Sequence, residues 1–125
     1  QLKDGKKELF IVNDKDGTPT YTQDFAKNVK YLIEKEYWGL YNMVCGGQTS
    51  RLEVTEELLD ILGLKDKIKL NVVTSEYFKE IYFAERPPCE RLDNRKLKIR
   101  NANLMSDWRV ALREYINNYY QDYLK

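Results

Sequence analysis

Short apolar stretches along this 125-residue chain alternate between the spacing of strands and the spacing of helices. The first, at residues 9–12, ends in Asn-Asp-Lys-Asp-Gly, which predicts a strand followed by a turn where Gly17 adopts φ > 0. Residues 40–45 are apolar up to a Gly-Gly pair, as expected of a strand buried on both faces. Residues 68–73 alternate and predict a third strand.

Two amphipathic helices are predicted between these strands. The first begins at Thr20, which forms a capping box with the glutamine three residues later, or at Thr22, and runs to about Tyr37. The second covers residues 51–62, because Ser-Arg-Leu-Glu is a capping box and Gly63 suits the position after a helix. The order strand, helix, strand favours an α/β architecture. The apolar stripe expected on the first helix is Phe25, Val29, Leu32 and Ile33.

A last helix is predicted from a cap at Ser106 to about Tyr123. We interpret its stripe of large side chains as core or as an interdomain face rather than as a ligand site, because buried aromatic residues at this spacing usually pack. The stripe consists of Trp108, Leu112, Tyr115, Ile116, Tyr119 and Tyr123.

The most informative segment is Glu-Arg-Pro-Pro-Cys-Glu-Arg-Leu-Asp-Asn-Arg-Lys-Leu-Lys, residues 85–98. Pro87 and the proline after it restrict the backbone directly behind Arg86. An arginine on a stiffened, non-helical segment can present its planar fork to an anion. Asp93 is expected to cap a short helix that carries Leu97 and so to support this segment. The alternative is an ordinary surface loop that enters a capped helix.

Composition excludes several kinds of function. The net charge of +1 creates no global field for nucleic acid or an anionic membrane, so we expect neither partner. The chain contains no histidine, which removes the commonest general base and zinc ligand. We interpret Cys45 and Cys89 as free thiols of a cytoplasmic protein. No apolar run approaches the length of a membrane span.

Cofactor and metal motifs are also incomplete. Gly46-Gly47 lacks the third glycine and the later acidic residue of a dinucleotide-binding turn, so we interpret it as a plain turn. Asp14 and Asp16 lack the distal glutamate of a calcium loop, and we interpret both as turn charges. We therefore predict no catalytic, cofactor-binding or metal-binding residue in this chain.

Nearly the whole chain resembles the C-terminal portion of the dTDP-4-dehydrorhamnose reductases, a branch of the extended short-chain dehydrogenase/reductase superfamily. The resemblance is carried by residues 12–26, by residues 39–50, by Arg86-Pro87 with Leu-Asp-Asn-Arg-Lys-Leu after it, and by residues 108–112. The absence of an Arg-Asp-Tyr run before the first helix favours the reductase branch over nucleotide-sugar epimerases and dehydratases.

The resemblance implies the substrate-binding portion of an oxidoreductase of dTDP-rhamnose biosynthesis. In the relatives that epimerise or dehydrate nucleotide sugars, the arginine matching Arg86 contacts the substrate diphosphate, and the resemblance implies the same role for Arg86. NADPH or NADH is expected to be held by an N-terminal Rossmann portion that is absent here. The catalytic Tyr-x-x-x-Lys also lies in that portion. Tyr31 and Lys35 have this spacing but occur on the first helix, outside any matching context.

We therefore expect the edge of a doubly wound nucleotide-binding sheet in residues 1–47 and a small mixed α/β substrate-binding lobe in residues 48–125. The expected partners are a dTDP-sugar and the Rossmann domain, and the expected location is cytoplasmic. Without that domain an exposed sheet edge favours self-association. Two alternatives are a non-catalytic binding or regulatory subunit that uses the aromatic face around Trp108, Tyr115 and Tyr119, and a fragment of an epimerase or dehydratase.

Overall fold

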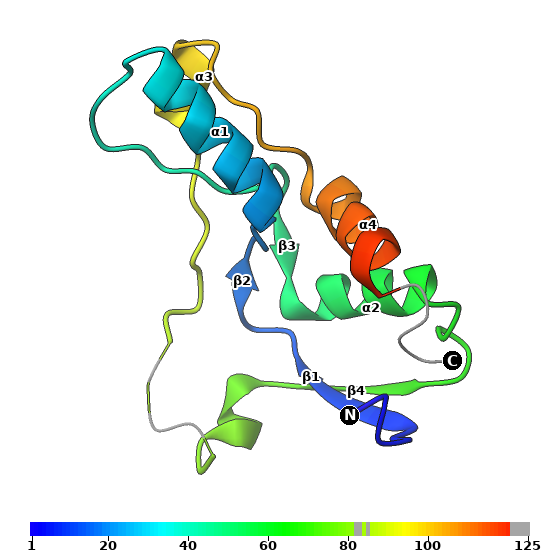
Figure 1. The fold of residues 1–125 in the computed structure, drawn as a ribbon. Helices are drawn as coiled ribbons and strands as arrows, with labels where there is room; N and C mark the ends of the chain where they lie inside the picture. The colour runs from blue at the N-terminus through cyan, green and yellow to red at the C-terminus, as the bar shows by residue number, and fades with distance from the viewer. Residues whose placement is uncertain (82–83, 85, 121–125) are drawn as a thin grey trace.

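The computed structural model describes residues 1–81, 84 and 86–120 of the chain. Helices and short strands are mixed along it, which confirms the predicted α/β class (Figure 1). The elements in chain order are β1 (Glu8–Val12), β2 (Asp16–Gly17), α1 (Thr22–Glu34), β3 (Thr49–Ser50), α2 (Arg51–Ile61), β4 (Lys69–Val73), η1 (Ser75–Phe78), α3 (Arg95–Ile99) and α4 (Trp108–Tyr119).

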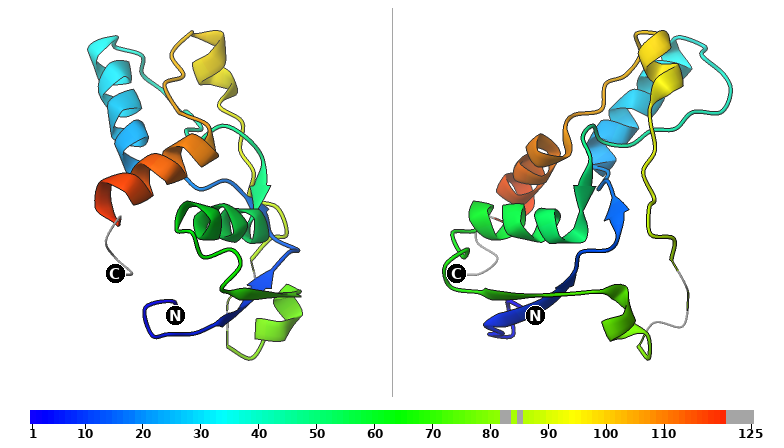
Figure 2. Two further views of the ribbon diagram at one scale, coloured as in Figure 1. Left: turned by 90° about the vertical axis from the view of Figure 1, so that its right-hand side faces the viewer. Right: turned by 180° about the vertical axis from the view of Figure 1, so that it is seen from behind.

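The strands form two separate pairs. β1 and β4 are parallel and in register over all five residues of each strand, which confirms the strands predicted at residues 9–12 and 68–73. Parallel neighbours need a crossover connection, and α2, which lies within that connection, packs against β1. β2 and β3 form an antiparallel pair of two residues each. Figures 1 and 2 show α1 and α3 at one end, the β1–β4 pair at the other, and α2 with β2 and β3 between them.

Helix α2 is the element that the sequence predicts best. The Ser50 hydroxyl accepts a hydrogen bond from the Glu53 N–H at 3.2 Å, and the Glu53 carboxylate accepts one from the Ser50 N–H at 2.9 Å. Gly63 follows the helix with a φ of +65°, a value that glycine adopts without strain. Both predicted ends of this helix are therefore confirmed, within one residue at the C-terminus.

Helix α1 buries a more polar face than the sequence predicts. Asp24, Asn28 and Leu32 are buried on one side of the helix. Two members of the expected apolar stripe, Phe25 and Ile33, are instead 44% and 54% exposed. The predicted stripe is thus wrong except for Leu32, which is buried, and Val29, which is half-buried.

The buried polar residues of α1 bind an irregular segment, residues 102–106. The Asn28 carboxamide donates to the Ala102 carbonyl at 2.9 Å and accepts from the Leu104 N–H at 2.8 Å. The Asp24 carboxylate accepts from the Ser106 N–H at 3.2 Å. A partly buried segment outside helices and sheets needs such partners, because unpaired backbone groups are costly away from water. This requirement explains why polar side chains occupy the buried face.

Several further predictions are wrong. Residues 40–45 form no strand, because no neighbouring strand of the described residues pairs with them. Tyr21 occupies the N-cap position of α1 and makes no side-chain capping bond, so neither threonine caps that helix. Asp107, not Ser106, caps α4, by accepting from the Arg109 N–H at 2.9 Å. Tyr123 lies outside the described residues.

Two clusters of buried apolar residues lie near the two ends of α1, and Leu9, Val12, Leu59 and Ile116 are buried outside these clusters. The first lies between the start of α1 and α4, and the second lies between the end of α1 and α3. The buried members of the first cluster are Tyr21, Cys45, Met105, Trp108 and Ala111, and those of the second are Leu32, Leu97 and Ala102.

No described helix has the length and apolar character needed to cross a bilayer.

Candidate functional site

The predicted anion-binding residue, Arg86, lies on an exposed segment formed by residues 86–91, which we call the strap. Every residue of the strap is exposed. The segment forms the lower part of the yellow-green trace that rises to α3 in Figure 1. Its position beside β2 brings together three parts of the chain that are distant in sequence.

Backbone hydrogen bonds attach the strap to the chain around β2. The Asp16 N–H donates to the Pro88 carbonyl at 2.8 Å, and the Glu90 N–H donates to the Asp16 carbonyl at 2.9 Å. Lys15 adds a side-chain bond, because its Nζ donates to the Arg86 carbonyl at 2.6 Å. The strap therefore forms an isolated parallel β-bridge with β2, between Cys89 and Asp16.

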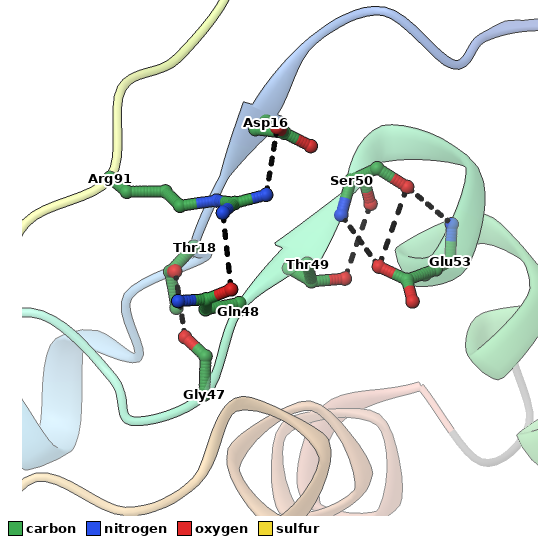
Figure 3. Close-up of polar contacts among 8 residues, drawn as sticks. All are labelled: Asp16, Thr18, Gly47, Gln48, Thr49, Ser50, Glu53 and Arg91. Atoms are coloured by element: carbon green, nitrogen blue, oxygen red, sulfur yellow. Dashed lines mark hydrogen bonds and ion pairs between the residues drawn. The ribbon is translucent and has the colours of Figure 1, made fainter.

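The side chain of Arg91 also attaches the strap to the chain around β2. Its guanidinium lies 2.7 Å from the Asp16 carboxylate and donates to the Gln48 side-chain oxygen at 3.1 Å (Figure 3). From the sequence, Asp16 was interpreted as a turn charge and Arg91 was not predicted to have a role. Nothing in the local pattern indicates this contact, because Gln48 lies 43 residues away in the chain.

The segment that leads into β3 is packed tightly at Gly47. The Thr18 hydroxyl donates to the Gly47 carbonyl at 3.1 Å (Figure 3). Gly47 adopts a φ of +88°, and a Cβ added there would lie 2.8 Å from the Trp108 ring. Only glycine fits both the backbone conformation and the close approach. The neighbouring Thr49 is buried, which anchors β3.

Arg86 itself is accessible to a ligand. Its side chain is 68% exposed, and its guanidinium lies 3.4 Å from the Glu90 carboxylate. A single contact of this length between exposed groups is weak, since water competes for both charges. The guanidinium can therefore exchange Glu90 for a phosphate or carboxylate of a ligand. Pro87, which follows it, is also exposed and lacks an N–H group.

Asp93 does not cap the short helix, and this prediction is wrong. Asn94 occupies the N-cap position of α3 and makes no side-chain capping bond. Its side chain is instead buried against Val44, where the carboxamide accepts from the N–H at 2.9 Å and donates to the carbonyl at 2.7 Å. Asp93 is exposed and pairs with Lys98.

The aromatic stripe of α4 divides between core and surface. Trp108 is fully buried, so the aromatic face that remains available to a partner is Tyr115, 37% exposed, and Tyr119, 54% exposed. These two tyrosines line a shallow pocket together with residues from the start of α1 and the end of α4. The additional lining residues are Tyr21, Thr22, Gln23 and Tyr120.

Both cysteines are free thiols, as predicted. Cys45 is buried, and its sulfur accepts a hydrogen bond from the Tyr21 N–H at 3.4 Å. Burial raises the pKa of the Cys45 thiol, which keeps it protonated and unreactive. Cys89 is exposed on the strap and forms a β-bridge with Asp16. The surroundings of Cys45 therefore indicate a structural role for its side chain, whereas at Cys89 the backbone makes the contact with Asp16.

Comparison with known sequences assigns the chain to a family. The model of the RmlD substrate binding domain matches residues 1–121. The chain belongs to this family. The spore coat polysaccharide biosynthesis protein SpsK of Bacillus subtilis is 35% identical to this RmlD-type chain over 117 residues, which are 93% of the chain and 39% of SpsK.

Solved structures show the same fold. A dTDP-4-dehydrorhamnose reductase from Clostridium acetobutylicum superposes with a TM-score of 0.86 at 30% identity, over 94% of this RmlD-type chain and 40% of the reductase. A dTDP-4-dehydrorhamnose reductase from Bacillus anthracis, in complex with NADP, superposes with a TM-score of 0.82 at 23% identity, again over 94% and 40% of the two chains. The chain thus spans about two fifths of the length of the proteins that it matches.

Proposed function

We propose that this chain is the substrate-binding part of an NAD(P)H-dependent enzyme that resembles dTDP-4-dehydrorhamnose reductase and acts in dTDP-rhamnose biosynthesis. The intact enzyme transfers a hydride to the 4-keto group of a dTDP-linked deoxysugar. The observation that carries the proposal is the match to a substrate-binding family over residues 1–121, together with similarity to reductases that extend well beyond it.

Within this function, Arg86 binds the diphosphate of the dTDP-sugar. Three observations support this role: the guanidinium is exposed, its carboxylate partner among the described residues lies at 3.4 Å, and its backbone is attached to Lys15. A diphosphate offers paired oxygens that match the planar arginine fork. Residues 1–47 join the nucleotide-binding sheet, and residues 48–125 form the substrate lobe. The cofactor is held outside this chain.

Calorimetry with dTDP and dTDP-sugars tests the proposal on the 125-residue chain. We expect binding by the wild-type chain and at least a tenfold loss of affinity for Arg86→Ala, about 1.4 kcal/mol or more, because a charged hydrogen bond to phosphate is removed. Arg95→Ala is the matched control, since Arg95 is also exposed but lies on α3. Equal affinities of the two variants would reject the role of Arg86, and hydride transfer by the isolated chain would reject the assignment as a non-catalytic part.

A further inference from the structure

Arg91 connects the strap to both strands of the β2–β3 pair. One terminal nitrogen lies 2.7 Å from the carboxylate of Asp16 in β2, and the other donates at 3.1 Å to Gln48, which directly precedes β3 (Figure 3). The planar guanidinium can hold two acceptors at fixed relative positions. A lysine at this position would supply the charge but not the two-point geometry.

The two prolines make this side-chain contact important for the strap. Pro87 and Pro88 have no N–H groups, so neither can donate to a β-ladder. The backbone donor that the strap provides to β2 is the N–H of Glu90, at 2.9 Å from the Asp16 carbonyl. Side-chain contacts from Lys15 and Arg91 therefore add to the two backbone bonds that hold the strap on β2.

Arg91 and Arg86 differ in what they are free to bind. The Arg91 side chain is 36% exposed and contacts two acceptors. Among the described residues, the Arg86 side chain is 68% exposed and contacts the Glu90 carboxylate at 3.4 Å. An arginine that already fills its fork with protein acceptors is poorly placed to bind a ligand. Arg91 thus has the contacts of a fastening residue, and Arg86 has those of a binding residue.

We propose that Arg91 is a positioning residue: it clamps the strap onto Asp16 and Gln48 and thereby presents Arg86 to an anionic group of the ligand. This inference rests on the proposed function, in which Arg86 binds a diphosphate. Asp16 is the centre of the clamp, because its N–H, its carbonyl and its carboxylate all contact the strap.

Amide hydrogen exchange tests the clamp without any ligand. We expect the Glu90 amide to exchange about two- to fivefold faster in Arg91→Ala than in the wild-type chain, the range that loss of a partly exposed ion pair implies. Arg91→Lys should lie between the two, and Arg95→Ala should leave this amide unchanged. Unchanged exchange in Arg91→Ala, with the thermal midpoint preserved, would overturn the proposal.

Calorimetry with dTDP tests the consequence for Arg86. Arg91→Ala should weaken dTDP binding about two- to fivefold, and the charge exchange Asp16→Arg with Arg91→Asp should recover part of the loss. In the Arg86→Ala background the Arg91→Ala change should have no further effect. If Arg91→Ala weakened dTDP binding in the Arg86→Ala background as much as in the wild-type chain, the proposal that Arg91 acts by positioning Arg86 would be overturned. Absence of dTDP binding by the wild-type chain would reject the proposed function, whereas faster Glu90 exchange in Arg91→Ala would still support the clamp.

Discussion

Residues 86–91 and residues 94–97 belong to one run of sequence but are attached to the molecule by different forces. The strap, residues 86–91, is exposed throughout and is held by polar contacts to the chain around β2. Three residues further on, Asn94 is 4% exposed and Leu97 is fully buried between α1 and α3. The same run thus changes from a polar attachment at the surface to a packed one in the core.

The difference separates the binding role from the structural role within this run. A buried apolar side chain stabilises the fold through the area it removes from water, and it cannot be displaced by a ligand. An exposed ion pair contributes little to stability, but its cationic side chain can leave its partner and pair with an incoming anion. The packed end fixes where the run lies, and the exposed end remains available for binding.

The largest expected effect comes from the packed end. Leu97→Ala should lower the free energy of unfolding by about 2–5 kcal/mol, because it leaves a cavity beside Leu32 and Ala102. Ile99→Ala on the same helix is the matched control, since Ile99 is 71% exposed and should change the value by less than about 0.5 kcal/mol. Urea unfolding measures both. Similar losses for the two variants would contradict the contrast between the buried and exposed sides of α3.

Asn94→Ala should have the next largest effect, about 1–3 kcal/mol of unfolding free energy. The change leaves the N–H and carbonyl of Val44 without their partner, and it also removes a bond to Asn103 at 3.0 Å. Asp93→Ala is the control and should cost less than about 0.5 kcal/mol, because Asp93 forms an exposed ion pair with Lys98. A larger loss for Asp93→Ala than for Asn94→Ala would instead support the sequence prediction that Asp93 caps the short helix.

Local signals in the sequence predicted both ends of α2 correctly, although similar signals misplaced the caps of α1, α3 and α4. The capping box of Ser50 and Glu53 needs only residues three positions apart, and Gly63 ends the same helix by its own conformational freedom. The role of Arg86, which stays a prediction, also rests on a local signal, because the adjacent prolines restrict the backbone beside it. Each of these inferences depends on neighbours within a few positions.

Features that depend on distant partners were not predictable in this way. Asn94 pairs with Val44, 50 residues away, and Arg91 pairs with Gln48, 43 residues away. Helical spacing shows that α1 is amphipathic, but the choice of its buried face depends on which backbone groups of residues 102–106 need hydrogen-bond partners. The same limit explains the missing strand at residues 40–45, since a strand requires a neighbour.

Asp14 forms another exposed contact, and the contribution of this contact to stability should depend on pH. Hydrogen bonds from the N–H and hydroxyl of Ser75 hold the pKa of the Asp14 carboxyl below its usual range. A lowered pKa in the folded state means that the stabilisation is present above the ordinary aspartate value of about 4 and is lost as pH falls through the folded value. The difference in thermal midpoint between the wild-type chain and Asp14→Asn should therefore shrink from pH 6 to pH 3. A constant difference would show that the charge does not matter.

The smallest effect is expected at the exposed end itself, where Glu90 competes with a ligand for Arg86. Their exposed contact at 3.4 Å must be exchanged before the guanidinium can bind an anion with its full fork. Glu90→Gln removes the competing charge but keeps the backbone N–H that bonds to Asp16. Affinity for dTDP should rise about twofold in calorimetry at low salt, and the gain should vanish at about 1 M salt, where exposed charges are screened. Glu36→Gln removes an exposed carboxylate beyond the end of α1 and controls for net charge; an equal gain there would show that the effect is global rather than local to the strap.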